Sequence, residues 1–309
     1  MEYHRVFNKN NMAQYVTLMN FYMTYGGTNW GHLGYPPAYT SYDYAATIPE
    51  NRVLSREKYS ENKLQANFMR VSPAYLTAIP QNYSNNIYTD TNTITTTPLF
   101  GDGSPTKFFV VRHTYWAEGS SASYKLTLPT SQGNLSIPQF AGTLTLSGRD
   151  SKWHVTDYDL AGTDLLYSTA EIFTWKDYGD KKILIVYGGP NEQHELAISD
   201  AKSAPKLLEG PATGTSFGGS ERAVVSWQTD TSRRVVQIDD LLIYILDRNS
   251  AYNHWVLDLE RSDYWGNYSA NIGNTTSIVL EAGYLVRHAS IDGTSLKLLG
   301  DLNATVPIR

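Results

Sequence analysis

The run Phe108-Phe-Val-Val-Arg112 opens the part of the sequence that decides the fold. Further short runs rich in β-branched and aromatic residues follow it, at 123–128 (SYKLTL), 142–146 (GTLTL), 182–187 (KILIVY), 224–227 (VVSW) and 241–246 (LLIYIL). Gly, Pro, Asn and Asp separate these runs at intervals typical of β-sandwiches. Long helical windows are absent after Pro73, so this part is predicted to be an antiparallel β-domain.

Two helices are predicted before Pro73, over residues 11–19 and 55–71. In the second, apolar residues recur near helical spacing, Ser55 is a plausible N-cap and Pro73 imposes a stop. Between the helices, residues 18–25 (LMNFYMTY) form an apolar run that ends at two glycines. A short apolar run flanked by helices fits a buried parallel strand.

The composition narrows the classes of partner. Charged residues make up only 18% of the 309 residues, against roughly 25% in typical soluble domains, whereas there are 23 Tyr and 7 Trp. Such a surface suits neutral polar partners such as sugars, although aromatic β-proteins also carry many Tyr in their strands. A net charge of −5 without any basic run argues against nucleic acid or an anionic membrane as partner.

The sequence also argues against a membrane-spanning helix, disulfides and metal sites. No apolar stretch approaches the roughly 20 residues of a membrane helix. The absence of cysteine excludes disulfides and thiolate metal sites. The histidines lack metal-ligand spacing, so neither a metal nor another cofactor is expected.

Residues 22–44 carry the features of a sugar-binding loop. Gly26 and Gly27 allow a sharp turn and close approach to a ligand, and Asn29 offers both a donor and an acceptor. Flat rings that could stack on a sugar are supplied by Trp30, Tyr35, Tyr39, Tyr42 and Tyr44. The alternative is a Gly-rich surface loop whose aromatic residues pack on their own scaffold.

Several motifs resemble the fungal β-galactosidases of glycoside hydrolase family 35. They are GGTNWG, GYPPAYTSYDY, SREKYSENKLQANFMRVSPAYLTA, FFVVRH, the long stretch 124–175, YGGPNEQHELAIS, LLIYILDRNSAYNHW and AGYLVRH. The resemblance covers nearly the whole chain. It implies a larger extracellular enzyme, with a (β/α)8 catalytic barrel and several β-domains, that removes terminal β-linked galactose with retention of configuration.

Carried over residue by residue, the resemblance implies two substrate-binding residues. Tyr44 matches a tyrosine that contacts galactose, and Tyr22 matches one close to the nucleophile. It also implies three parts: residues 1–74 as the C-terminal remnant of the barrel, 75–256 as the antiparallel β-sandwich of the second domain, and 257–309 as a truncated third domain.

The catalytic carboxylates of the family have no counterpart in this sequence. Retaining glycosidases need two carboxylates about 5–5.5 Å apart, and the Glu-Phe-Gln-Gly-Gly motif of the nucleophile is absent. Glu57 and Glu61 are interpreted as a solvated helix face, and Glu171 has no visible companion. No catalytic residue is therefore assigned, and the isolated chain is expected to be inactive.

Three interpretations of function remain open at this stage. The chain is a piece of a β-galactosidase, a β-sandwich module that binds glycans without cleaving them, or a structural remnant. Its partners are expected to be β-linked galactosides, and its exposed β-edges to favour self-association. No signal peptide is recognised at the N-terminus, while sequons at Asn82, Asn134, Asn267, Asn274 and Asn303 permit a secreted glycoprotein.

Overall fold

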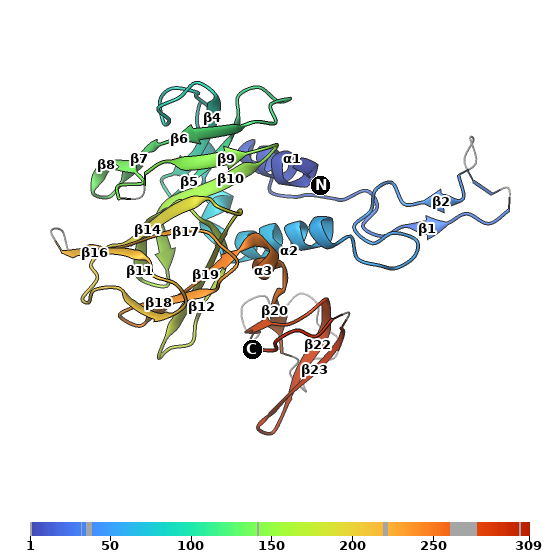
Figure 1. Ribbon diagram of the computed structural model, residues 1–309. Coiled ribbons are helices and arrows are strands. Elements are labelled where there is room, and N and C mark those ends of the chain that lie inside the picture. Colours follow the sequence, from blue (N-terminus) through green and yellow to red (C-terminus); the bar gives the residue numbers. More distant parts are fainter. Residues whose placement is uncertain are drawn as a thin grey trace. The chain divides into compact units, whose positions relative to one another are not determined.

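A computed structural model describes residues 2–31, 33–34, 39–140, 142–218, 222–259, 277–302 and 304–309. The chain divides into two compact units, Met1–Arg248 and Asn249–Arg309. Most of the described residues of the first unit build a mainly antiparallel β-sandwich, preceded by two α-helices (Figure 1). No helix in the described part of the chain is long and apolar enough to cross a membrane.

The larger sheet of the sandwich has the strand order β16–β17–β14–β11–β10–β5–β4–β3. All of its neighbouring strands are antiparallel. Its strands are β3 (Ile79–Pro80), β4 (Ile94–Gly101), β5 (Ser104–His113), β10 (Ser151–Leu160), β11 (Thr163–Ser168), β14 (Gln193–Ile198), β16 (Gly214–Gly218) and β17 (Arg222–Gln228).

The smaller sheet has the order β12–β13–β19–β18–β15. Its strands are β12 (Glu171–Asp177), β13 (Lys182–Gly188), β15 (Lys206–Glu209), β18 (Arg234–Ile238) and β19 (Leu241–Asp247). The predicted sandwich is confirmed, with one departure from a purely antiparallel arrangement, since β13 and β19 run parallel from Lys182↔Leu241 to Gly188↔Asp247.

Both faces of the larger sheet are buried. Phe108 and Val110 on β5 belong to the core between the two sheets, whereas Phe109 and Val111 belong to a second core on the opposite face. That second face is covered by β6 (Ser121–Tyr124) paired with β9 (Leu144–Ser147) and by β7 (Leu126–Thr130) paired with β8 (Gly133–Ile137). The run that decides the fold is uninterruptedly apolar because alternate side chains enter different cores.

Helix α2 (Arg56–Arg70) confirms the second predicted helix. It starts directly after Ser55, although no side-chain capping bond forms there, and it is followed by the 3-10 helix η1 (Pro73–Thr77). Phe68 of α2 packs on Phe108 and Trp153, with ring centroids 6.2 and 5.5 Å away. This aromatic cluster joins α2 to the sandwich.

The first predicted helix is displaced toward the N-terminus. Helix α1 spans Glu2–Ala13 rather than 11–19, and the left-handed backbone of Tyr15 (φ 65°) follows its end. Its fully buried residue Lys9 donates to the carbonyl oxygen of Ser151 (2.7 Å) and to the carboxylate of Glu171. Hydrophobic periodicity misplaced this helix because its buried contact is an ion pair, and Glu171 therefore has a companion that the sequence did not reveal.

The buried parallel strand expected over residues 18–25 does not form. Leu18 is 85% exposed and Phe21 is 45% exposed. The segment makes one isolated parallel bridge, between Tyr25 and Ile48. A buried parallel strand needs hydrogen-bonded neighbours on both sides, and the described residues pair with this segment only through that bridge.

Glu61 is likewise not on a solvated helix face. Only 2% of it is exposed, its carboxylate lies 3.5 Å from the Arg5 guanidinium, and it accepts a hydrogen bond from Gln65. Burial opposes its ionisation, but the charges of Lys9, Arg248 and Arg5 keep the pKa of Glu61 below its usual value. The helical spacing of Glu57 and Glu61 could not reveal the burial of Glu61, because cations from other parts of the chain compensate its charge.

The second unit is a small β-structure. Helix α3 (Arg248–Tyr252) spans its start, followed by β20 (His254–Asp258) paired with β21 (Ser277–Glu281) and by the hairpin of β22 (Leu285–Asp292) and β23 (Ser295–Asp301). The C-terminal Arg309 exchanges two backbone hydrogen bonds with Glu281. The polar composition of residues 262–269 (SDYWGNYS) predicts a boundary between domains, but this stretch lies outside the described residues.

Candidate functional site

The loop 22–44 is organised by a short hairpin of β1 (Gly27–Thr28) and β2 (Ser41–Tyr42). Gly26 enters this hairpin against Asp43, whose Oδ1 would lie 1.8 Å from a Cβ placed on Gly26. The same oxygen accepts a hydrogen bond from the backbone N–H of Glu50 (2.7 Å). The glycine is thus required for close approach, and Asp43 holds the loop rather than serving a proton transfer.

The base of the hairpin is tied to the segment before α2. Gly26 donates its N–H to the carbonyl oxygen of Ile48 (2.7 Å), and its own carbonyl accepts from the Arg52 guanidinium (2.6 Å). Thr47 donates its hydroxyl to the carbonyl oxygen of Thr24 (2.7 Å). These contacts fix the direction in which the aromatic side chains leave the loop.

Three tyrosines gather at the base of the hairpin. The hydroxyls of Tyr22 and Tyr42 are 3.0 Å apart, and the ring of Tyr44 meets those of Tyr22 and Tyr42 edge-on, at centroid distances of 6.0 and 4.9 Å. The hydrogen bond with Tyr22 is the main cause that raises the pKa of Tyr42. Neutral hydroxyls that donate and accept are what a pyranose hydroxyl needs.

The backbone around Tyr44 is strained into the left-handed region, at φ 47° for Tyr44 and 57° for Ala45. Lys58 of α2 holds this turn by donating to the carbonyl oxygen of Ala45 (2.7 Å). Non-glycine residues adopt this conformation at a cost and only where their surroundings impose it. Tyr44 is therefore presented in a fixed direction.

Tyr22 and Tyr44 line one cavity of about 420 Å³. Its other walls come from α1, from α2 and from the segments that lead into and out of the hairpin. These lining residues are His4, Phe21, Met23, Thr24, Ala45, Thr47, Tyr59, Asn62, Lys63, Ala66 and Asn67. We call this cavity the rim cavity. Both residues carried over by the resemblance thus lie at the same hollow, although their ligand contacts remain a prediction.

The polar groups that α2 contributes to the rim cavity escaped the sequence analysis. Asn62 accepts a hydrogen bond from Asn8 (3.1 Å), and its Oδ1 lies 3.1 Å from Nδ1 of His4. Burial, assisted by the nearby Arg56, lowers the pKa of Lys63 to about 7. Their signal in the sequence is the helical spacing of residues 59, 62, 63, 66 and 67, which places them on one side of α2.

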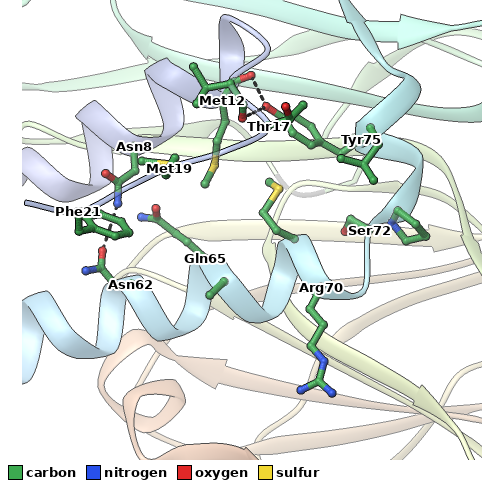
Figure 2. A pocket seen from close by; sticks show the side chains of 15 residues that line it. Asn8, Met12, Thr17, Met19, Phe21, Asn62, Gln65, Arg70, Ser72 and Tyr75 are labelled. Carbon is green, nitrogen blue, oxygen red and sulfur yellow. Dashed lines mark hydrogen bonds between the residues drawn. The ribbon is translucent and has the colours of Figure 1, made fainter. Parts of the chain in front are cut away.

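A second cavity, of about 350 Å³, adjoins the rim cavity and shares Phe21, Asn62 and Ala66 with it. Figure 2 shows it between α1 and α2, with Met12 and Met19 on one side and Gln65 on the other. Tyr75 closes one end, where its hydroxyl oxygen lies 2.9 Å from the carbonyl oxygens of both Met12 and Val16. Its lining, like that of the rim cavity, is predominantly apolar.

The remaining aromatic candidates lie between β1 and β2 in the sequence. Trp30 and Tyr39 are 76% and 67% exposed, and Tyr35 lies outside the described residues. The side-chain amide of Asn29 donates to the carbonyl oxygen of Tyr39 (2.9 Å), so one of its two N–H groups stabilises the loop.

The described lining of the rim cavity is suited to binding a sugar rather than to catalysis. None of its described lining residues is a carboxylate. The nearby Glu50 accepts from the Thr28 hydroxyl (2.5 Å). Aromatic rings, amides and hydroxyls bind sugars, but general acid and nucleophilic steps on a glycoside need a pair of carboxyl groups.

The sequence was compared with protein families and with individual proteins. Residues 1–69 match glycosyl hydrolases family 35, residues 77–254 match β-galactosidase domain 2, and residues 255–309 match β-galactosidase domain 3. The chain is 51% identical over 308 residues to β-galactosidase A of Aspergillus oryzae and 52% identical over 309 residues to β-galactosidase A of a Penicillium species.

The similarity covers 99% of this chain but only 30% of each relative's length. A β-galactosidase A of Aspergillus niger, 52% identical, shows the same proportions. The chain belongs to the family 35 β-galactosidases, of which it carries a segment of the glycosyl hydrolase domain followed by β-galactosidase domains 2 and 3.

Proposed function

We propose that this chain is part of a β-galactosidase that releases terminal, non-reducing β-D-galactose with retention of configuration, and that the rim cavity forms one wall of its galactose pocket. Family membership and the names of the relatives support this role. The residues 1–74, 75–256 and 257–309 would then be the barrel segment, the second domain and the third domain.

The observation that carries the proposal is the convergence of Tyr22 and Tyr44 on one cavity. Tyr44 offers an exposed ring, held by its strained backbone, against which the apolar face of galactose can stack. Tyr22, 75% exposed, offers a hydroxyl already oriented by Tyr42. Asn62 and Asn67 supply amide groups on the opposite wall.

Hydrolysis by the chain on its own is not part of the proposal. A retaining mechanism requires an acid/base and a nucleophile, and the described lining residues of the rim cavity include no carboxylate. In the proposed enzyme the two carboxyl groups come from elsewhere, and this chain contributes substrate contacts. The isolated chain would therefore bind galactose without turning over galactosides.

Ligand-observed NMR with galactose, followed by titration, tests the proposal. Tyr44→Ala is expected to weaken galactose binding about fivefold, since one stacking partner contributes on the order of 1 kcal/mol. Tyr83→Ala is the matched control, because Tyr83 is similarly exposed (69%) and does not line the cavity. Equal binding by Tyr44→Ala and Tyr83→Ala would refute the role of Tyr44.

A glycan-binding module without catalysis is the second candidate. It is favoured by the same lack of carboxylates among the described lining residues. The coding sequence upstream of Met1 distinguishes the two. An in-phase reading frame that encodes Glu-Phe-Gln-Gly-Gly supports the enzyme, and a stop codon with galactose binding by the chain supports the module.

We further propose that the protein is secreted, as the resemblance implies, and that it is glycosylated at its sequons. Asn82 and Asn134 lie in sequons and are exposed, whereas Asn267, Asn274 and Asn303 lie outside the described residues. Expression through a eukaryotic secretory pathway should yield a protein whose mass falls on treatment with an N-glycosidase. An unchanged mass would contradict the glycosylation.

A further inference from the structure

A cavity of about 450 Å³ lies where α1 meets the end of β5 and the start of β10. It is lined by Val6, Phe7 and Asn10 of α1, by the segment 112–116 with Glu118, and by Arg149 and Asp150. We call it the Trp116 cavity. It shares no lining residue with the rim cavity.

Two adjacent aromatic side chains stand at this cavity. Trp116 is 83% exposed and Tyr115 is 61% exposed, with ring centroids 5.9 Å apart and planes tilted by 52°. Large apolar rings left this open to water are costly, and they mark binding surfaces when polar groups surround them. Two neighbouring platforms suit two consecutive units of a chain of sugars.

The loop that carries these rings is preorganised. Thr114 is fixed through its N–H to the carbonyl oxygen of Thr93 (2.8 Å) and through its hydroxyl to that of Asn92 (2.9 Å). Glu118 turns the loop by accepting from the N–H groups of Gly119 (2.9 Å) and Ser120 (2.8 Å). Ordering of the loop on binding therefore costs little entropy.

The second, independent observation is His113. It is only 6% exposed, it lines the cavity, and neither ring nitrogen has a hydrogen-bond partner. Buried polar atoms in native proteins are nearly always paired with protein or solvent groups. An imidazole can donate at one nitrogen and accept at the other, as a ligand hydroxyl requires.

Other polar groups around the cavity are also available. Arg149 is exposed and forms no ion pair with any described residue, and the side-chain amide of Asn10 makes no hydrogen bond within that part of the chain. The carboxylate of Asp150, in contrast, is occupied by Arg248 at 2.9 Å. The free groups are planar donors and acceptors beside aromatic rings, a combination that recognises vicinal hydroxyls.

We propose that the Trp116 cavity is a second, non-catalytic carbohydrate site that takes a neutral hexose oligosaccharide. Trp116 and Tyr115 stack on consecutive sugar units, while His113, Asn10 and Arg149 bind their hydroxyls. The site would hold a polysaccharide strand on the β-sandwich independently of the rim cavity.

Affinity electrophoresis of the full 309-residue chain in gels containing soluble β-galactan tests this site, with titration by a β-linked galactotetraose for affinity. Trp116→Ala is expected to weaken oligosaccharide binding at least about tenfold, or about 1.4 kcal/mol. Free galactose should bind this variant as it binds the unmodified chain. Phe140→Ala is the matched control, because Phe140 is 60% exposed and does not line the cavity.

A second variant separates this proposal from the rim cavity. Tyr44→Ala should weaken galactose binding and keep retardation by galactan, whereas Trp116→Ala should show the reverse. Retardation by polygalacturonate but not by galactan would overturn the neutral ligand class. Equal retardation of Trp116→Ala and Phe140→Ala, with both variants folded by their melting temperatures, would overturn the site itself.

Discussion

The β-sandwich and the segment 14–54 treat their aromatic and aliphatic residues in opposite ways. In the sandwich, Phe108 and Phe109 are fully buried in two separate cores. In the segment 14–54, Leu18, Tyr22 and Tyr44 are 85%, 75% and 62% exposed. The apolar runs look alike in the sequence, so apolar content alone does not decide burial.

The difference lies in where the partners of each segment are found. Every strand of the two sandwich sheets is hydrogen-bonded to neighbours within the same unit. Residues 18–25 make a single bridge. The sandwich is thus stabilised by its own cores. The segment 14–54 is held by a few turn contacts, which leave its tyrosines available to a ligand.

Truncation of Phe108 should give the largest effect on stability. Phe108→Ala leaves a cavity in the aromatic cluster with Phe68 and Trp153 and should cost about 3–5 kcal/mol of the free energy of unfolding. Phe21→Ala, in the exposed segment, should cost less than about 1 kcal/mol. Urea titrations measure both, and comparable losses would contradict the contrast between the two regions.

Acid should weaken the sandwich through His154, which has 0% exposure and lies 3.1 Å from the hydroxyl of Tyr124. Burial, with the charges of Lys152 and His194, lowers the pKa of His154 to about 3. The unfolded chain binds this proton below pH ~6.5, so stability is lost as the pH falls from ~6.5 toward 3.

The chain should lose about 2–3 kcal/mol more between pH 7 and pH 4.5 than His154→Gln does, from a shift of roughly two pH units at 1.36 kcal/mol each. Asp150 and Glu192 also have pKa values held low, by Arg248 and Lys152 despite burial. Their contribution is lost only below pH ~4 and is common to both proteins. Identical pH profiles would show that His154 does not supply this dependence.

A substitution in the second unit should have the smallest effect, and it should alter self-association rather than stability. Leu296 and Leu299 on β23 are 44% and 63% exposed, and Ile291 on β22 is 56% exposed. Exposed apolar side chains on a hairpin favour edge-to-edge pairing. Leu299→Lys should lower the apparent mass in light scattering, and a monodisperse monomer before substitution would contradict this prediction.

Strands such as β5, β13 and β19 could be predicted because each carries its own signal, a run of β-branched or other apolar residues bounded by turn residues. Others, such as β16, carry no such run. Helix α1 could not be placed, since the buried Lys9 depends on Glu171, far away in the sequence. Glu61 was misjudged for the same reason, because its compensating charges come from other elements. Hydrophobic periodicity does not detect buried ion pairs.

The candidate sites were predicted to different extents. Tyr22 and Tyr44 were chosen through family resemblance, and their shared cavity depends on the pairing of Gly27 with Tyr42, which no local pattern specifies. The Trp116 cavity went unnoticed, although adjacent aromatic residues in a turn after a strand are a signal. His113 became a candidate only through its unpaired ring.

The central claim is that the rim cavity recognises galactose while the two catalytic carboxylates lie elsewhere. Turnover of an aryl β-galactoside by the purified chain tests this claim most directly. The expected result is no hydrolysis above the buffer background, in a preparation that binds galactose through Tyr44. Turnover that survives rigorous purification and scales with protein concentration would contradict the claim.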